Sequence, residues 1–144
     1  MSGPGIIRLE VPGIIAFRDV VLRTTSAASK LVAPADDQLF TTHIVSAVGE
    51  AFNNIAQHGY RGRPPDVVRL GFELGSGYLR VTLEDFGESF HPDAAARPDL
   101  AALPESGMGI FIIKSFVDEL SYTQGRPNVL TLVKRSGGAA GGVP

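Results

Sequence analysis

The chain has 144 residues, a length that fits one domain of ordinary size with a substantial hydrophobic core. Hydrophobic residues make up 44% of it and charged residues 19%, which is typical of globular rather than disordered proteins. The formal net charge of -2 gives no general attraction to nucleic acid or to an anionic membrane, so we expect neither as a direct partner. The absence of cysteine excludes disulfides, thiolate zinc sites and cysteine nucleophiles.

The ends of the chain predict a cytoplasmic protein with one folded domain. Apolar stretches are broken well before membrane-spanning length, and the first residues lack the basic start and apolar run of a signal peptide. Glycine-rich segments at 1–5 and 136–144 predict flexible tails around a single domain at 6–135. That domain is expected to begin with an edge strand at 6–11, which the Pro-Gly pair at 12–13 closes.

Two helices are predicted next along the chain. Apolar residues set among charged ones from about residue 14 to residue 32 indicate a moderately amphipathic helix. Its apolar positions are Ile15, Val20, Leu22 and Leu31. Asp36 and Asp37 favour the N-terminus of a second helix, which Gly59 ends. The core-facing stripe of this second helix is Ile44, Val48, Ala51 and Ile55.

A β-hairpin follows the second helix. Apolar and polar residues alternate at 67–74 and again at 79–84, on either side of a Gly-Ser-Gly turn at 75–77. This pattern predicts two antiparallel strands with one buried face. Residues 91–106 contain three prolines and show no clear period, so we expect an irregular connector there.

The last third of the chain completes the predicted fold. A third helix is expected at about 110–118, followed by two strands at 120–123 and 129–134. Helices on one face of a mixed, mostly antiparallel sheet make an α+β two-layer sandwich.

Asp85 is the residue most indicative of a binding site. It shares the parity of the apolar residues in the second hairpin strand, so its side chain is expected to point to the buried face. Burying an unpaired carboxylate costs on the order of several kcal/mol, so this group must meet a donor. The donor is either a protein group, such as a neighbouring backbone turn, or a ligand group, such as the amino group of adenine. Gly87 favours the ligand, because glycine lets backbone approach a flat molecule closely.

Glu50 and Asn54 stand four residues apart and therefore share one face of the second predicted helix. An amide oxygen is a competent ligand for Mg²⁺. A nearby glutamate can orient or deprotonate a hydroxyl nucleophile. The alternative is an ordinary solvated helix face. Asn53 and Asn54 are poor helix formers in the middle of a helix, which favours a functional role.

A glycine-bearing segment opens the third predicted helix. It consists of Ser106, Gly107, Met108 and Gly109. Its backbone N–H groups can bind phosphate oxygens at the helix N-terminus, although a flexible hinge explains the same glycines equally well. It is not a Walker loop, because no Gly-Lys-Ser/Thr sequence follows.

Two other assignments are set aside. Residues 85–87 match the Asp-Phe-Gly triplet of protein kinases, but the other motifs of those enzymes are absent from the sequence. His43, His58 and His91 are dispersed, and without cysteine or a paired-histidine spacing they do not indicate a zinc site.

Taken together, these segments resemble the GHKL (Bergerat-fold) ATPases. Residues 50–54 with 58–60 resemble the N box, residues 85–90 the G1 box and residues 106–110 the G2 box. The nearest likeness is to the anti-sigma-factor serine/threonine kinases of bacteria. It covers nearly the whole chain and includes the ending at 128–132.

The resemblance implies ATP and Mg²⁺ as ligands and gives roles to the matching residues. In that family the N-box glutamate is the general base, which implies Glu50, and the N-box asparagine coordinates Mg²⁺, which implies Asn54. The G1 aspartate binds the adenine amino group, which implies Asp85 with Gly87 beside it. The remaining nucleotide-binding residues implied by the resemblance are Ser106, Gly107, Met108, Gly109 and, near adenine, Thr131.

The same resemblance implies a serine kinase that binds a sigma factor and phosphorylates the STAS-type antagonist of the anti-sigma factor, in a homodimer. Ser89 stands where the G1 box has a second glycine, and Glu105 stands where relatives often carry a basic residue. Both departures favour an alternative, a nucleotide-regulated anti-sigma binding module with weak or no kinase activity. A histidine-kinase-like catalytic domain fits less well, because it needs an upstream helix with an acceptor histidine and little chain precedes the N box.

Overall fold

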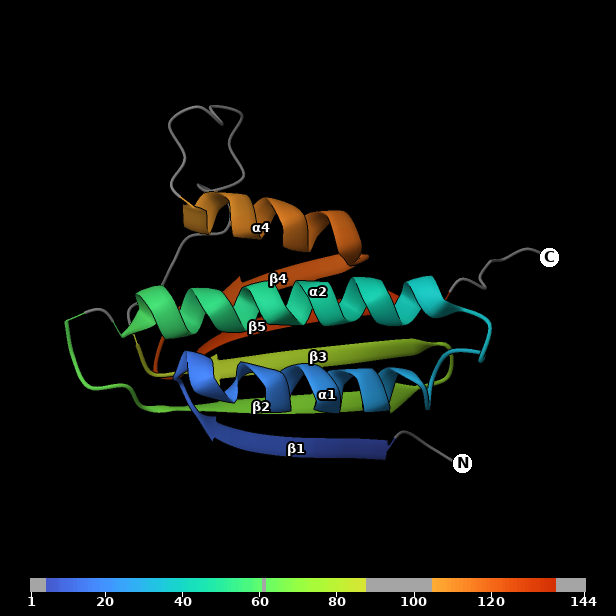
Figure 1. Ribbon diagram of the computed structural model, residues 1–144, viewed down its shortest axis with the longest axis horizontal. Helices are drawn as coiled ribbons and strands as arrows, with labels where there is room; N and C mark the ends of the chain where they lie inside the picture. The colour runs from blue at the N-terminus through green and yellow to red at the C-terminus, as the bar shows by residue number, and fades with distance from the viewer. Residues whose placement is uncertain (1–4, 61, 88–104, 137–144) are drawn as a thin grey trace.

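A computed structural model describes residues 5–60, 62–87 and 105–136, apart from the side chains of His58 and of residues 105–108. Figure 1 shows a β-sheet with its helices gathered on one face. The strands are β1 (Gly5–Pro12), β2 (Val67–Gly75), β3 (Tyr78–Asp85), β4 (Glu119–Thr123) and β5 (Asn128–Arg135). The helices are α1 (Arg18–Ser29), α2 (Gln38–Asn54) and α4 (Glu105–Phe116), with a short 3₁₀ turn η1 (Ile15–Phe17) before α1 and a π-helical segment η2 (Ile55–Gly59) continuing α2.

The sheet has the strand order β1-β2-β3-β5-β4, and each of these four pairings is antiparallel. The helix α2 packs between α1 and α4, so the helices form a second layer over the sheet. This confirms the predicted α+β two-layer sandwich. The predicted hairpin is β2 and β3, whose turn contains Gly77 with a φ of 77° that glycine adopts without strain.

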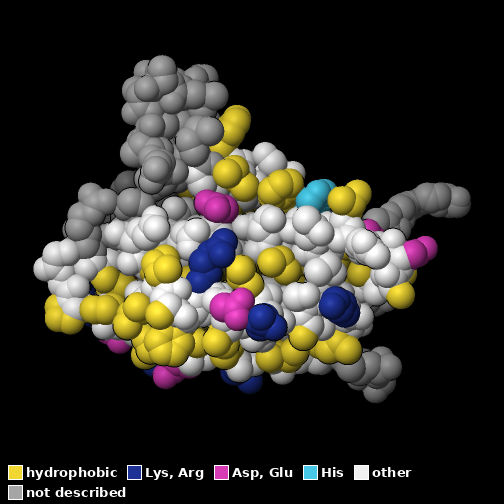
Figure 2. Space-filling model, viewed as in Figure 1, with side chains coloured by type: hydrophobic (Ala, Val, Ile, Leu, Met, Phe, Trp, Pro, Cys, Tyr) yellow, Lys and Arg dark blue, Asp and Glu magenta, His cyan; other side chains and the backbone are white. Residues whose placement is uncertain are grey.

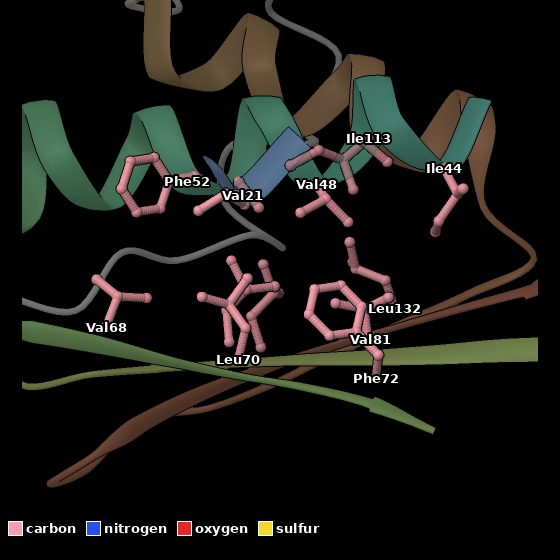
Figure 3. Packing of buried hydrophobic residues seen from close by; sticks show 14 of the residues in the cluster. Val21, Ile44, Val48, Phe52, Val68, Leu70, Phe72, Val81, Ile113 and Leu132 are labelled. Carbon is pink, nitrogen blue, oxygen red and sulfur yellow. The ribbon is translucent and has the colours of Figure 1, made fainter. Parts of the chain in front are cut away.

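The core lies between α2 and the sheet. All four residues of the stripe predicted for the second helix are at most 2% exposed, and Phe52 joins them. Figure 3 shows Ile44, Val48 and Phe52 of α2 pointing towards Leu70, Phe72 and Val81 of the hairpin. The N-terminus of α2 is also as predicted, because the Asp37 carboxylate accepts a hydrogen bond of 3.2 Å from the Phe40 N–H.

The first helix is present as α1, and of its four predicted apolar positions only Leu22 is partly buried. Ile15, Val20 and Leu31 are 42%, 44% and 70% exposed. The buried residues of α1 are Val21, Thr25, Ala28 and Ser29. Their hydroxyl groups are satisfied locally, since Thr25 donates to the Val21 carbonyl and Ser29 shares a hydrogen bond of 2.7 Å with Thr41 of α2. Small residues with satisfied hydroxyls therefore face α2, and hydropathy alone does not identify them.

The third helix begins earlier than predicted. It starts at Glu105 and ends at Phe116, so the Ser-Gly-Met-Gly segment is helical and not a loop. Two glycines disfavour a helix by about 1 kcal/mol each relative to alanine. The burial of Ile110 and Ile113 against the core opposes that cost. Of the predicted connector, residues 91–104 lie outside the described residues.

The predicted tails begin close to where the described residues end. Gly5 already belongs to β1, and the Ser136 N–H donates to the Gly77 carbonyl at 2.9 Å. Residues 1–4 and 137–144 lie outside the description.

The surface over the helix layer carries charges of both signs. Figure 2 shows acidic and basic side chains interspersed on this face of the described residues, without a continuous patch of either sign. This mixture agrees with the net charge of -2 for the whole chain. Among the described helices, none combines the length and hydropathy that a membrane-spanning helix needs.

Candidate functional site

Asp85 lies at the end of β3, in the middle strand of the sheet, and faces the helix layer. It is 3% exposed, and it continues the buried series formed by Leu79, Val81 and Leu83. The parity prediction is therefore confirmed. Across the sheet it is paired with Val68 of β2 on one side and with Asn128 of β5 on the other.

The Asp85 carboxylate has protein donors on one of its two oxygens. The Gly87 N–H donates to Oδ1 at 2.9 Å, and the Asn128 Nδ2 donates to the same oxygen at 3.1 Å. Both of these hydrogen bonds from described residues end at Oδ1, which leaves Oδ2 as an acceptor. The backbone turn that the sequence offered as one alternative is thus present, and it satisfies one oxygen.

Burial raises the pKa of the Asp85 carboxyl above its usual value, because a buried charge is poorly solvated. The hydrogen bonds from Asn128 and Gly87 act in the opposite direction and lower the pKa, since they stabilise the ionised form. The net effect is a raised pKa, so the two donors compensate only in part for the desolvation of this carboxyl group.

Gly87, in the loop after β3, packs closely against Gly59 at the end of η2. A Cβ placed on Gly87 would lie 2.2 Å from the Gly59 carbonyl oxygen, which is closer than Cβ atoms in proteins come to a non-bonded atom. The glycine is therefore required by the approach of the Gly59 backbone, whichever ligand also binds there. The sequence interpretation assigned this glycine to the close approach of a flat ligand, and it did not predict the contact with the Gly59 backbone.

Tyr60 fixes the same loop from the other side. Its hydroxyl donates to the Val67 carbonyl at 3.0 Å and accepts from the Phe86 N–H at 3.3 Å. The side chain is 5% exposed. Burial is the main reason why its pKa is raised, so the hydroxyl stays protonated and keeps its donor role. Sequence analysis placed Tyr60 in the N-box segment but gave it no role.

The second part of the site lies where α2 meets α4. A Cβ on Gly109 would lie 3.2 Å from Glu50 Oε1 and 3.3 Å from Asn54 Oδ1. Both predicted polar residues of α2 therefore face the first turns of α4. Because Gly109 has no side chain, α4 can approach this pair closely.

Asn54 is 6% exposed and its Nδ2 atom has no hydrogen-bond partner among the described residues. The same holds for Oδ1 of its neighbour Asn53. Buried polar groups without a partner are rare in folded proteins and call for an explanation such as a ligand. The helix also changes from α to π directly after Asn54, a distortion that is frequent at functional sites.

The helix α4 brings free backbone donors to this region. Its first residues include Glu105, Ser106 and Gly107, and the first N–H groups of any α-helix lack a partner within the helix. Such groups bind phosphate oxygens together with the helix dipole. The structure does not describe the side chains of residues 105–108. The part of the phosphate-binding prediction that can be compared with it therefore concerns the backbone N–H groups of this segment.

Thr131 is not brought to the other predicted residues. It pairs with Thr82 of β3 and Ser121 of β4, on the face of the sheet that points away from the helices. Asp85 points to the opposite face, so the prediction that places Thr131 near a base bound by Asp85 needs correction. Asn128 occupies that place. Sequence analysis missed Asn128, although a polar residue at an inward-facing position of the last strand was the available signal.

Metal ligands were predicted at Asn54 alone. Within the described residues, no three side chains of histidine, cysteine, aspartate or glutamate gather closely enough to hold a metal ion. Mg²⁺ usually keeps several waters and binds through one or two protein groups plus substrate phosphates. The Oδ1 atom of Asn54 is the atom of this amide that could ligate a cation in that way, whereas its Nδ2, which has no partner among the described residues, is a donor and suits an acceptor such as a phosphate oxygen.

Two hollows on the described surface lie away from these residues. One of about 290 Å³ lies on the outer face of the sheet around Gly71, and one of about 470 Å³ lies between the end of α1 and the start of α2. Neither is lined by a residue predicted for the site.

Comparison with known proteins identifies the family. Residues 15–134 match the family described as the histidine kinase-like ATPase domain. The chain belongs to this family. The GHKL resemblance inferred from the three boxes is thereby confirmed, and membership of an ATPase family implies ATP binding.

Two curated relatives are similar in sequence to about two thirds of this chain. An anti-sigma F factor of Bacillus cytotoxicus is 34% identical over 101 residues, which cover 67% of this chain and 68% of the relative. An anti-sigma F factor of Halalkalibacterium halodurans is 33% identical over 101 residues, which also cover 67% of this chain and 68% of the relative.

Solved structures support the fold. The histidine kinase domain of the Erythrobacter litoralis EL346 blue-light activated histidine kinase superposes with a TM-score of 0.55 at 21% identity. The superposition covers 87% of this chain and 61% of that one. At this level of identity the likeness concerns the ATPase fold alone.

Proposed function

We propose that this chain is an ATP- and Mg²⁺-dependent serine kinase that also acts as an anti-sigma factor. In this proposal one domain at 6–135, between flexible tails, binds a sigma factor. It phosphorylates the STAS-type antagonist that would otherwise displace that sigma factor. The observation that carries the proposal is the meeting of Glu50 and Asn54 at Gly109, because it places a carboxylate, and a buried amide whose Nδ2 has no partner among the described residues, beside the first turns of α4.

The nucleotide would be bound at both parts of the site. Asp85 Oδ2 is an acceptor for the amino group of adenine, and the first N–H groups of α4 are donors for the phosphates. Asn54 would hold Mg²⁺, which supplies charge neutralisation on the phosphate oxygens when it is bound. Gly87 and Gly109 would keep backbone close to the ligand.

Glu50 would act as the general base. It is half-buried beside Gly109, where its carboxylate can accept the proton of a serine hydroxyl from the antagonist. The serine oxygen then forms a bond to the γ-phosphorus of ATP, while the bond between that phosphorus and the β–γ bridging oxygen breaks. ADP leaves with the bonding electrons, and the proton remains on Glu50.

Phosphoryl transfer tests this proposal. The protein is incubated with Mg-ATP labelled at the γ-phosphate and with STAS-type antagonists from the same genome, and the label on serine is measured. The matched control is Glu50→Gln, which keeps the shape but not the basicity. We expect the unmodified protein to label one antagonist and the variant to do so about 10²- to 10⁴-fold more slowly, with ATP affinity unchanged. Full activity in the variant would remove Glu50 from the mechanism.

The relatives support the proposed partners. Curated relatives at 33–34% identity are named anti-sigma F factors, which supports a sigma factor and an antagonist as partners of this chain. The family resemblance supports a homodimer and a cytoplasmic location as parts of the same proposal.

A second candidate is a nucleotide-regulated anti-sigma binding module with weak or no kinase activity. It is favoured by Glu105, which begins α4 and puts an acidic residue in the turn that would receive the phosphates. Sigma-factor binding that depends on ATP, without label on any antagonist, would favour this candidate.

A further inference from the structure

Asn128 is the first residue of β5 and is 1% exposed, which is unusual for an asparagine side chain. Its side-chain amide makes hydrogen bonds with one side chain and two backbone groups. The Nδ2 atom donates to Asp85 Oδ1 at 3.1 Å and to the Gly87 carbonyl at 3.0 Å. The Oδ1 atom accepts from the Gly125 N–H at 3.0 Å.

These contacts fix the orientation of the amide. Both hydrogens of Nδ2 have acceptors, and Oδ1 has a donor from the turn between β4 and β5. Turning the amide over would put its oxygen against the Asp85 carboxylate and the Gly87 carbonyl, both of which are acceptors. The Nδ2 group is therefore held towards Asp85.

The orientation of Asn128 determines which atom of Asp85 remains available. Oδ1 already accepts from Nδ2 of Asn128 and from the Gly87 N–H, so this oxygen is occupied on the protein side. Oδ2 receives no hydrogen bond from the described residues. An ionised carboxylate is an acceptor only, so Oδ2 accepts from an N–H group and repels a carbonyl oxygen.

We propose that Asn128 is a positioning residue that sets base specificity, because it holds Asp85 with only Oδ2 free for the base. The ligand class is purine nucleotides with an amino group at C6 of the base. This inference rests on the proposed ATP binding. A site built to accept an N–H rejects analogues without it far more strongly than an apolar site rejects a change of size.

The test compares three triphosphates whose bases differ at C6, each with Mg²⁺; the 6-oxo base of inosine triphosphate also carries a hydrogen on N1. ATP carries an amino group there, inosine triphosphate an oxygen and purine riboside triphosphate a hydrogen. The unmodified protein is expected to bind ATP best and inosine triphosphate worst. Asn128→Leu should lower the affinity for ATP roughly tenfold, as expected when an acceptor for a hydrogen bond to a charged group is misplaced. The same variant should change the affinity for purine riboside triphosphate by less than about twofold, because that base makes no hydrogen bond at C6.

A second Asn128 variant, a control variant and a double variant keep the test informative even if Asn128→Leu does not fold. Asn128→Ser retains a polar side chain that is too short to reach Asp85, and it should show the same loss of discrimination if the leucine variant does not fold. Thr82→Val lies on the opposite face of the sheet and should bind all three nucleotides as the unmodified protein does. When Asp85→Asn is already present, adding Asn128→Leu should not further change the ratio of the affinity for ATP to the affinity for purine riboside triphosphate, because Asn128 acts through Asp85.

The outcomes separate three cases. An equal loss of affinity for all three nucleotides in the Asn128 variants would show that Asn128 only maintains the fold, and would overturn the inference. An unmodified protein that binds ATP and purine riboside triphosphate equally would overturn it as well, while ATP binding would stand. Absence of binding for every triphosphate would overturn the proposed function itself.

Discussion

The Asp85 carboxylate is buried, with one oxygen occupied by protein donors and the other oxygen left unused by the part of the chain that the structure describes. Its pKa is raised by burial, so ionisation is less favourable in the folded protein than in the unfolded chain. A raised folded pKa means that the contribution of this group to stability is full below the unfolded pKa, about 3.9. That contribution is lost as pH rises through the folded value. At neutral pH the unliganded protein therefore carries a destabilising charge in its site, as functional sites often do.

Asp85→Asn is predicted to act on stability and binding with opposite signs. The side-chain oxygen of the variant still accepts from Gly87 and Asn128, while the buried charge is removed, so the unliganded variant should unfold at a higher temperature at pH 7. The stability lost by the unmodified protein above about pH 4 should be absent from the variant. The NH₂ group of the variant points a donor where an acceptor is needed, and ATP affinity should fall by about 1–3 kcal/mol.

Thermal unfolding from pH 3 to pH 8, with and without Mg-ATP, measures both effects. Equal ATP affinity in the two proteins would contradict the assignment of Asp85 to the base. A lower unfolding temperature for the unliganded variant at pH 7 would contradict the account of its charge.

At the residue scale, sequence parity identified Asp85 but not its neighbours. Strand alternation places a side chain on a face without reference to other strands, so it was sufficient for Asp85. Thr131 and Asn128 differ by three positions, and therefore by face, and the register between β3 and β5 shows that Asn128 is the residue opposite Asp85. The role of Gly87 was equally hidden, because Gly59 contacts it from a segment 28 positions earlier.

At the element scale, the site depends on how closely α4 approaches α2. Gly109 is the contact point, and its missing side chain leaves room for Glu50 and Asn54. The two helices pack along their length, and Ile110 and Ile113 of α4 belong to the core. The position of the predicted base and metal ligand is therefore fixed by a helix contact and not by a loop.

Gly109→Ala is predicted to separate fold stability from activity. Alanine favours a helix over glycine by about 1 kcal/mol, so the variant should be at least as stable as the unmodified protein. Its methyl group would lie 3.2 Å from Glu50 Oε1, which is too close, and the flexible glutamate side chain must move. Phosphoryl transfer should fall roughly 10- to 100-fold, because a small misplacement of a catalytic group is costly.

Ser115→Ala on α4 is the matched control, since its exposed hydroxyl donates to the Phe111 carbonyl and bonds to no other described residue. It changes helix propensity in the same element without approaching the site, and it should retain full transfer activity. Unaltered transfer in Gly109→Ala would show that the contact with Glu50 has no catalytic consequence.

Helix prediction from sequence succeeded where burial follows hydropathy. The stripe of α2 is apolar throughout and was found, together with its cap at Asp37. The helix α1 buries threonine and serine whose hydroxyls are satisfied within the helix layer, and this satisfaction is not visible in sequence. The early start of α4 was missed because its glycines oppose a helix that the packing on α2 stabilises.

At the scale of the whole molecule, the fold brings together three segments that are far apart in the chain. The N-box residues come from α2 and η2, the G1 residues from the end of β3, and the G2 residues from α4. Because β3 lies in the middle of the sheet and α2 in the middle of the helix layer, their ends meet at one side of the molecule (Figure 1). The contacts of Gly87 with Gly59 and of Gly109 with Glu50 and Asn54 link the three segments directly.

Calorimetric titration of the unmodified protein with ATP, in the presence and absence of Mg²⁺, tests most directly whether these three segments form one nucleotide site. The account predicts that ATP binds and that Mg²⁺ raises its affinity. It also predicts that Asn54→Leu, whose side chain cannot coordinate a cation, binds ATP without this enhancement. Absence of ATP binding by the unmodified, folded protein under both conditions would contradict the account.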